Sequence, residues 1–139
     1  MKKIIWIILI VVVIVSLYFY LTHFSLPRYM QFLKATCDLS VPRNVELIHF
    51  QEDDYPISGD YYVELILKLD DKALANLTNE AKEKGYEKLP IENLLGGFIY
   101  ENYSLSDKGL FKVVQKNNNE KTILINQTQG KLIIQVISL

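Results

Sequence analysis

An uncharged apolar run near the start of the chain constrains its fold more than any other feature. From Ile4 to Leu21 the sequence reads IIWIILIVVVIVSLYFYL, with Ser16 as its one small polar residue. As a helix rising about 1.5 Å per residue, the run is roughly 27 Å long, close to the thickness of a bilayer's hydrocarbon core. A core helix of a soluble protein shows a polar face every three or four positions, and this run has none. The sequence therefore predicts a transmembrane helix.

The flanks of this run predict that it is retained and oriented. Bulky residues from Leu17 to Leu21 stand where a signal peptide has small residues for cleavage, so cleavage is not expected. Lys2 and Lys3 precede the run, which by the positive-inside rule predicts a cytoplasmic N-terminus and an extracytoplasmic C-terminal part. We expect a single-pass signal-anchor protein of a cell membrane, and the usage of Lys, Ile and Asn is typical of bacterial proteins.

Three segments are expected along the chain. Residues 1–24 form the cytoplasmic N-terminus and the membrane anchor. Residues 25–44, which contain Pro27 and Pro42, form a stalk with a short helix. Residues 45–139 form one extracytoplasmic domain, whose stability must come from packing because Cys37 is the only cysteine of the chain.

The pattern of residues 45–139 predicts an α+β domain. Residues 61–69 alternate between apolar and polar side chains, as in a strand with one buried face. Asp70 is a good helix N-cap, the apolar residues that follow have helical spacing, and Gly85 suits a helix C-terminus. With strands also expected at 45–50, 98–103, 110–115, 122–126 and 131–139, the order is β-β-α-β-β-β-β, a mainly antiparallel sheet with one packed amphipathic helix.

Charge and motifs argue against several functions. Without Lys2 and Lys3, 13 of the 15 basic residues remain against 16 acidic ones, and they form no basic cluster of the kind that nucleic acids require. His23 and His49 are the only histidines, and His49 fits the face of a strand better than the role of a catalytic base. No nucleophile motif accompanies them, so we expect no enzyme activity, no metal site and no cofactor.

The candidate binding residues are four tyrosines of the predicted sheet, because amphipathic rings are enriched at interfaces. Their alternative interpretation is that aromatic side chains simply suit strands. Together with the anchor and the lack of catalytic motifs, they predict a membrane-anchored protein-binding domain that serves as an inhibitor, an immunity-type protein or an envelope assembly factor. The alternative is a sensor of a ligand or cation, or an enzyme, that uses the acidic loop 52–60 with Asp53, Asp54 and Asp60. The four tyrosines are Tyr61, Tyr62, Tyr100 and Tyr103.

Overall fold

A computed structural model describes residues 2–23, 26–55, 58–92 and 97–139 of the chain. The chain divides into two compact units, Met1–Thr36 and Cys37–Leu139, which are described separately below.

The first unit holds two helices, α1 (Lys2–His23) and α2 (Arg28–Thr36). The large apolar side chains of α1 from Trp6 to Leu21 are all more than half exposed. Among the described residues, no helix meets the length and apolarity that crossing a membrane requires. A short helix is present within residues 25–44, where the sequence predicts one, and its buried residues are Met30 and Leu33.

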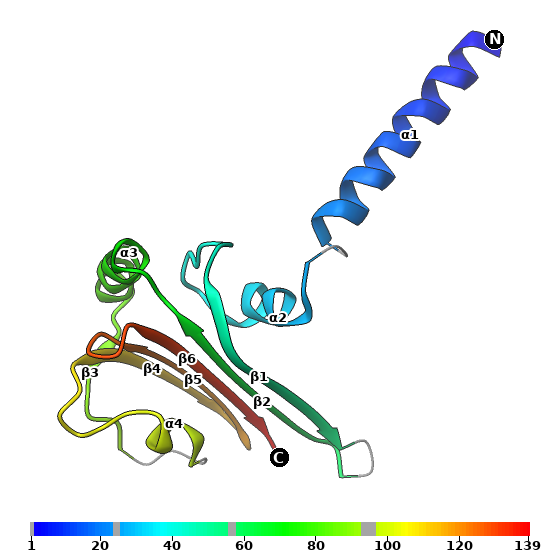
Figure 1. Cartoon of the computed structure of the whole chain (residues 1–139). Coiled ribbons are helices and arrows are strands. Elements are labelled where there is room, and N and C mark those ends of the chain that lie inside the picture. Colours follow the sequence, from blue (N-terminus) through cyan, green and yellow to red (C-terminus); the bar gives the residue numbers. More distant parts are fainter. Residues whose placement is uncertain (1, 24–25, 56–57, 93–96) are drawn as a thin grey trace. The chain divides into compact units, whose positions relative to one another are not determined.

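The second unit is a small α+β domain built on a six-stranded antiparallel sheet, as Figure 1 shows. The strands lie in the order β1-β2-β6-β5-β4-β3, so the last strand of the chain lies between β2 and β5. The predicted class of domain and its antiparallel sheet are therefore confirmed. The strands are β1 (Glu46–Tyr55), β2 (Asp60–Lys68), β3 (Glu87–Lys88), β4 (Gly109–Lys116), β5 (Asn119–Asn126) and β6 (Lys131–Ser138).

Two of the predicted element positions are wrong. Residues 98–103 are not a strand: Phe98–Glu101 forms the helix α4, and the short strand β3 occupies the edge of the sheet instead. Residues 52–55 do not belong to a loop, because β1 continues through them and pairs with β2 as far as Tyr55 and Asp60. Gly59, with φ of 79°, lies in the turn that follows.

The helix α3 (Asp71–Glu83) forms where the sequence predicts it. The backbone N–H of Ala73 donates to the Asp70 carboxylate at 2.7 Å, which satisfies one of the free donors at the helix start. At the other end Gly85 has φ of 74°, a conformation that glycine adopts without strain. Figure 1 shows α3 and α4 on opposite sides of the sheet, and the two faces are named the α3 face and the α4 face below.

The strand register assigns side chains to these two faces. Ile66, Ile133, Leu124 and Phe111 are successive partners across β2, β6, β5 and β4, and they pack with Ile99 of α4 in one buried cluster. The next row, which starts one residue earlier in β2, faces the other way because side chains alternate along a strand. It consists of Leu65, Ile134, Ile123 and Lys112.

Candidate functional site

A row of polar side chains crosses the α4 face beside the apolar cluster. Glu64, Gln135, Thr122 and Val113 are successive partners across β2, β6, β5 and β4. Gln135 is 1% exposed and Thr122 is 0% exposed, so the row passes through the buried middle of the sheet. Polar side chains are rare in such a place unless their hydrogen bonds are satisfied.

The hydrogen bonds of this row are only partly satisfied. The Gln135 amide donates from Nε2 to the hydroxyl of Tyr62 at 2.8 Å. Within the described part of the chain, Gln135 Oε1 and Thr122 Oγ1 have no hydrogen-bond partner although both are buried. A buried polar atom without a partner costs about 1–3 kcal/mol. We call Gln135 and Thr122 the unsatisfied pair.

Tyr62 links the unsatisfied pair to Glu64 and His49. Burial raises the pKa of Tyr62 to about 12, and a hydrogen bond to the carboxylate of Glu64 adds to the shift. The Nε2 atom of His49 lies 3.0 Å from Glu64 Oε2, and the His49 ring lies 5.6 Å from the ring of Phe98. His49 thus lies on a strand face, as its position in the sequence suggests, and the structure adds that it is paired with the carboxylate of Glu64.

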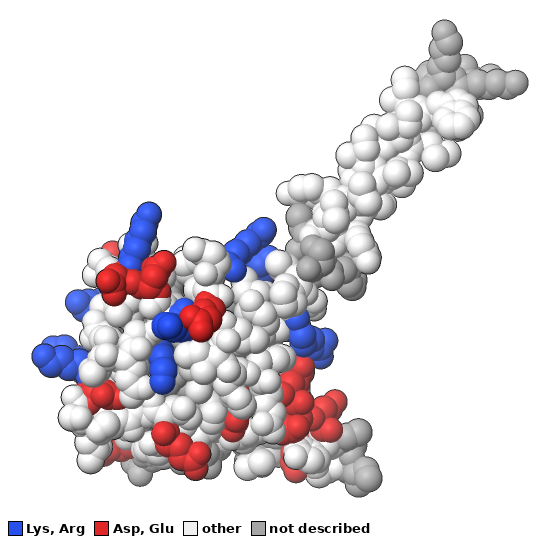
Figure 2. Space-filling model, viewed as in Figure 1, with Lys and Arg blue, Asp and Glu red and all other residues white. Residues whose placement is uncertain are grey.

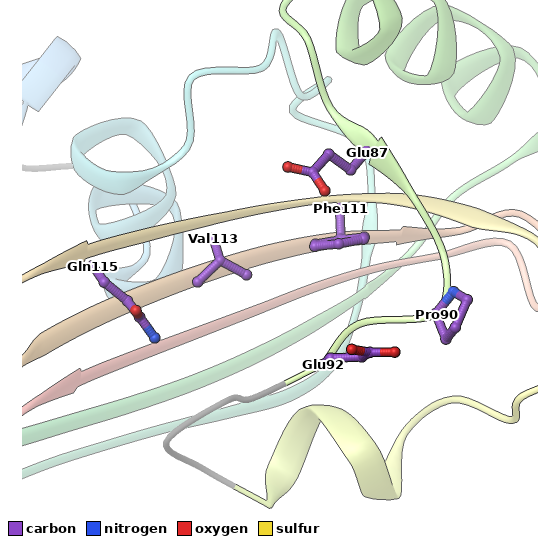
Figure 3. Close-up of a pocket in the computed structure, with 6 residues that line it drawn as sticks. All are labelled: Glu87, Pro90, Glu92, Phe111, Val113 and Gln115. Carbon is purple, nitrogen blue, oxygen red and sulfur yellow. The ribbon is translucent and has the colours of Figure 1, made fainter.

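A pocket of about 400 Å³ opens on the same face, at the β4 side of the sheet (Figure 3). Figure 3 shows its side chains coming from β4 and from the segment that includes β3 and the residues after it. Glu87 and Glu92 are exposed, and Phe111 forms the apolar floor with Val113. The described lining contains two carboxylates and no cationic side chain. The lining residues are Glu87, Pro90, Glu92, Phe111, Val113 and Gln115.

A third carboxylate lies behind the pocket. Gln115 donates from Nε2 to Glu120 Oε2 at 2.7 Å, and Glu120 is 1% exposed. Val113, which lines the pocket, is the strand partner of Thr122. The pocket therefore adjoins both a buried carboxylate and the unsatisfied pair, and it suits a ligand with positive charge or hydrogen-bond donors.

The pocket also lies at an uncovered part of the edge of the sheet. β3 is two residues long and pairs only with Leu110 and Phe111 of β4. In the described sheet, no strand lies beyond Val113 and Gln115. The N–H of Leu89 donates to the carbonyl of Gly109, so the backbone groups of every second residue from Gly109 point outward, including those of Val113 and Gln115.

The four tyrosines that the sequence suggests as binding residues do not lie on one face of the sheet. Tyr61 belongs to the α3 face, and its hydroxyl donates to Glu52 at 2.9 Å, whereas Tyr62 belongs to the α4 face. Tyr100 and Tyr103 lie together, with ring centroids 6.3 Å apart. Tyr103 packs against the apolar cluster, and its hydroxyl donates to the carbonyl of Ile91 at 3.4 Å. Tyr100 is the most exposed of the four tyrosines.

The acidic residues of segment 52–60 gather at the end of the β1–β2 hairpin, where Figure 2 shows a patch of negative charge. Asp53 and Asp54 are partners of Tyr62 and Tyr61, so their side chains point to opposite faces of the hairpin. Among the residues that the structure describes, no three of the His, Cys, Asp and Glu side chains lie close enough together to hold a metal ion.

A second polar cluster, which we call the Asp38 cluster, lies on the α3 face. Tyr86 donates its hydroxyl to Asp38 Oδ1 at 2.6 Å, and Lys112 donates from Nζ to Asp38 Oδ2 at 2.6 Å. The Lys112 ammonium also lies 5.5 Å from the centre of the Tyr86 ring. Burial alone would raise the pKa of Asp38, but the hydrogen bonds from Lys112 and Tyr86 hold it below its ordinary value.

The Asp38 cluster continues to α3. Ser40 donates to the Glu80 carboxylate from its backbone N–H at 2.8 Å and from its hydroxyl at 3.1 Å. Lys84 donates to Glu80 at 2.8 Å and also to the carbonyl of Asp38. Burial opposes the shift, but these bonds lower the pKa of Glu80. The cluster connects residues 38–40 to α3 and β4.

The sequence predictions missed the pocket and the unsatisfied pair. One signal was present: Gln135 is a polar residue within an otherwise apolar stretch of its strand. The pocket has no comparable signal, because Glu92 and Gln115 belong to distant parts of the sequence that meet only through the pairing of β3 with β4. Neither a protein-family model nor a curated protein matches the chain.

Proposed function

We propose that this chain is a membrane-anchored binding domain without catalytic activity, and that it captures a protein partner through the pocket at the β4 edge. The observation that carries the proposal is the position of that pocket. It combines an apolar floor, two carboxylates and backbone groups that no described strand covers, at one edge of a small sheet. Such a combination provides both affinity and selectivity for a polypeptide. An inhibitor, an immunity-type protein and an envelope assembly factor all work through such capture.

The proposal of a membrane anchor rests on the apolar run of the sequence. The run is 18 residues long from Ile4 to Leu21 and contains no charged residue. The large apolar side chains from Trp6 to Leu21 are more than half exposed, and an exposed helix that is apolar on all sides needs an apolar environment. Lys2 and Lys3 before the run favour an orientation with the sheet domain outside the cytoplasm.

The orientation can be tested by thiol labelling at a new position. Cys37 is a poor reporter because burial raises the pKa of its thiol to about 11, which leaves little reactive thiolate at neutral pH. Leu105 is 86% exposed. In a Cys37→Ser chain, Leu105→Cys should react with a membrane-impermeant maleimide in intact cells whose outer membrane, where present, is permeabilised. Reaction only after lysis of the cells would contradict the proposed orientation.

Partner capture can be tested by photocrosslinking in the cells that produce the chain. A photoreactive amino acid in place of Gln115, at the pocket, should give a discrete adduct of higher mass. The matched control replaces Lys72, an exposed residue of α3. The proposal fails if Gln115 gives no adduct, or if both positions give the same one.

A further inference from the structure

The uncovered part of β4 and the pocket beside it lie next to each other on one edge of the sheet. We propose that this edge binds an extended segment of the partner as an added antiparallel or parallel strand, with a lysine or arginine side chain of that segment in the pocket beside Glu87 and Glu92. This inference rests on the proposed capture of a protein partner and specifies the chemistry of the captured segment.

The backbone of β4 supports strand addition. Among the described residues, β3 pairs with β4 only at Leu110 and Phe111, and the backbone N–H and C=O groups of Val113 and Gln115 point away from β5 toward the edge that no described strand covers. An added strand would continue the line of β3 and would hydrogen-bond to these groups. Main-chain bonds of this kind provide affinity for many different sequences, so selectivity must come from side chains.

The pocket supplies that selectivity. In paired strands, residues opposite each other place their side chains on the same face. A residue opposite Val113 would therefore extend its side chain over the α4 face, where Val113, Phe111 and Gln115 line the pocket. The aliphatic part of a lysine or arginine side chain would contact Phe111 and Val113. Its charged end would reach the carboxylates of Glu87 and Glu92.

Charge on the two faces of this edge favours a basic side chain in only one direction. The α4 face carries Glu87 and Glu92, with the buried Glu120 behind Gln115. The α3 face of the same strand carries Lys112. A strand with basic side chains toward the α4 face therefore meets opposite charge there, whereas in the reverse placement its basic side chains meet Lys112, whose charge is already paired with Asp38.

The other edge of the sheet is less suited to strand addition. β1 carries Glu46, Glu52, Asp53 and Asp54 along its length, and its pairing with β2 is irregular between Leu47 and His49. Charges and bulges are the means by which edge strands avoid pairing with other chains. The two edges thus differ, and the β4 edge is the one with a pocket for a side chain.

Two peptides that differ only in charge test the proposal. The probe is a fluorescent octapeptide of alternating threonine and lysine, and its control has glutamate in place of lysine. Binding to the full chain in nonionic detergent micelles is followed by fluorescence anisotropy, with empty micelles as the blank. We expect the lysine peptide to bind at least about tenfold more tightly than the glutamate peptide, which corresponds to about 1.4 kcal/mol. Equal binding would overturn the proposal.

Backbone pairing is tested from both sides of the interface. Two versions of the lysine peptide are N-methylated at alternate peptide bonds, one at the odd positions and one at the even positions. Only the version whose methyl groups face β4 should bind more weakly. On the protein, Val113→Pro removes an outward N–H without removing a bond to β5, and it should weaken binding about tenfold. Circular dichroism shows whether this variant is folded; where it is not, the methylated peptides decide. Unchanged binding of both methylated peptides would overturn strand addition.

Charge variants locate the bound side chain. Glu87→Gln and Glu92→Gln should each weaken binding of the lysine peptide several-fold, whereas Glu46→Gln on the opposite edge should leave it unchanged. Competition by lysine amide at concentrations similar to those of the peptide would overturn the proposal in favour of a site for free amines. If crosslinking at Gln115 succeeds and the lysine peptide fails to bind, capture of a partner stands and strand addition falls. If the lysine peptide binds and crosslinking fails, the proposed function falls instead.

Discussion

Both faces of the sheet contain a polar cluster, but the hydrogen bonds are satisfied on the α3 face and only partly satisfied on the α4 face. On the α3 face, both carboxylate oxygens of Asp38 accept hydrogen bonds, from Tyr86 and Lys112. On the α4 face, Gln135 and Thr122 each keep a buried oxygen without a partner among the described residues. The first arrangement stabilises the domain through its bonds, while the second lowers stability by leaving polar atoms desolvated. A protein retains the second kind where another requirement outweighs stability.

The helix on the α3 face is also longer and better capped than the helix on the α4 face. α3 has 13 residues, a side-chain N-cap from Asp70 and a link to residues 38–40 through Glu80. α4 has four residues and no side-chain cap. The α3 face is thus built for stability, and the α4 face, with its pocket and unsatisfied pair, is the one on which we place binding.

The largest expected effect is the loss of the Asp38 carboxylate. Asp38→Ala removes the acceptor for the buried hydroxyl of Tyr86 and the ion-pair partner of Lys112. Since hydrogen bonds to charged groups contribute about 1.5–3 kcal/mol, we expect the free energy of unfolding to fall by about 2 kcal/mol. Urea unfolding of the full chain in micelles, followed by circular dichroism, measures this change.

An exposed ion pair provides the matched control. Lys68 and Glu46 lie 3.3 Å apart with both side chains more than 60% exposed. Because exposed ion pairs contribute little, Glu46→Ala should change the free energy of unfolding by less than about 1 kcal/mol. If the two variants are equally stable, the Asp38 cluster is not the structural link that its hydrogen bonds suggest.

Much of the fold could be predicted from local sequence. The alternation of Val63, Leu65 and Leu67 identifies β2, and Asp70 with Gly85 marks both ends of α3. Each of these signals depends on neighbouring residues alone. The hairpins from β4 to β6 follow from the same kind of pattern, because short turns separate alternating strands.

Errors arose where distant residues decide the local structure. Phe98 and Ile99 have side chains that suit strands, but they pack on Ile66 and Ile133, which are far away in the sequence. The candidate site depends even more on such contacts. Thr122 follows three polar residues in β5, so the sequence does not mark it as buried, and its adjacency to the pocket depends on the register of β5 against β4. Register across several strands is not readable from one strand's pattern.

The next effect in size is the response of stability to acid. The pKa values of Asp38 and Glu80 are lowered in the folded chain, from ordinary values of 3.8 and 4.5. A lowered pKa stabilises the fold above the ordinary value, and this contribution is lost as the pH falls through the folded-state pKa. We expect the urea midpoint to fall as the pH is lowered below about 4.5, and Asp38→Asn, which cannot titrate, to show a shallower fall. An identical acid response in both chains would contradict the role of Asp38.

The smallest expected change in stability has the opposite sign and tests the α4 face. Thr122→Val keeps the shape of the side chain and removes the hydroxyl that has no described partner. Because a buried polar atom without a partner is destabilising, the free energy of unfolding should stay the same or rise by up to about 1 kcal/mol, as urea unfolding would show. A loss of stability would mean that the hydroxyl is bonded in solution, and the contrast between the two faces would then disappear. A gain would show that stability is not the reason for a threonine in the middle of the sheet, beside a valine that lines the pocket. Binding at the β4 edge would then be the remaining explanation to test.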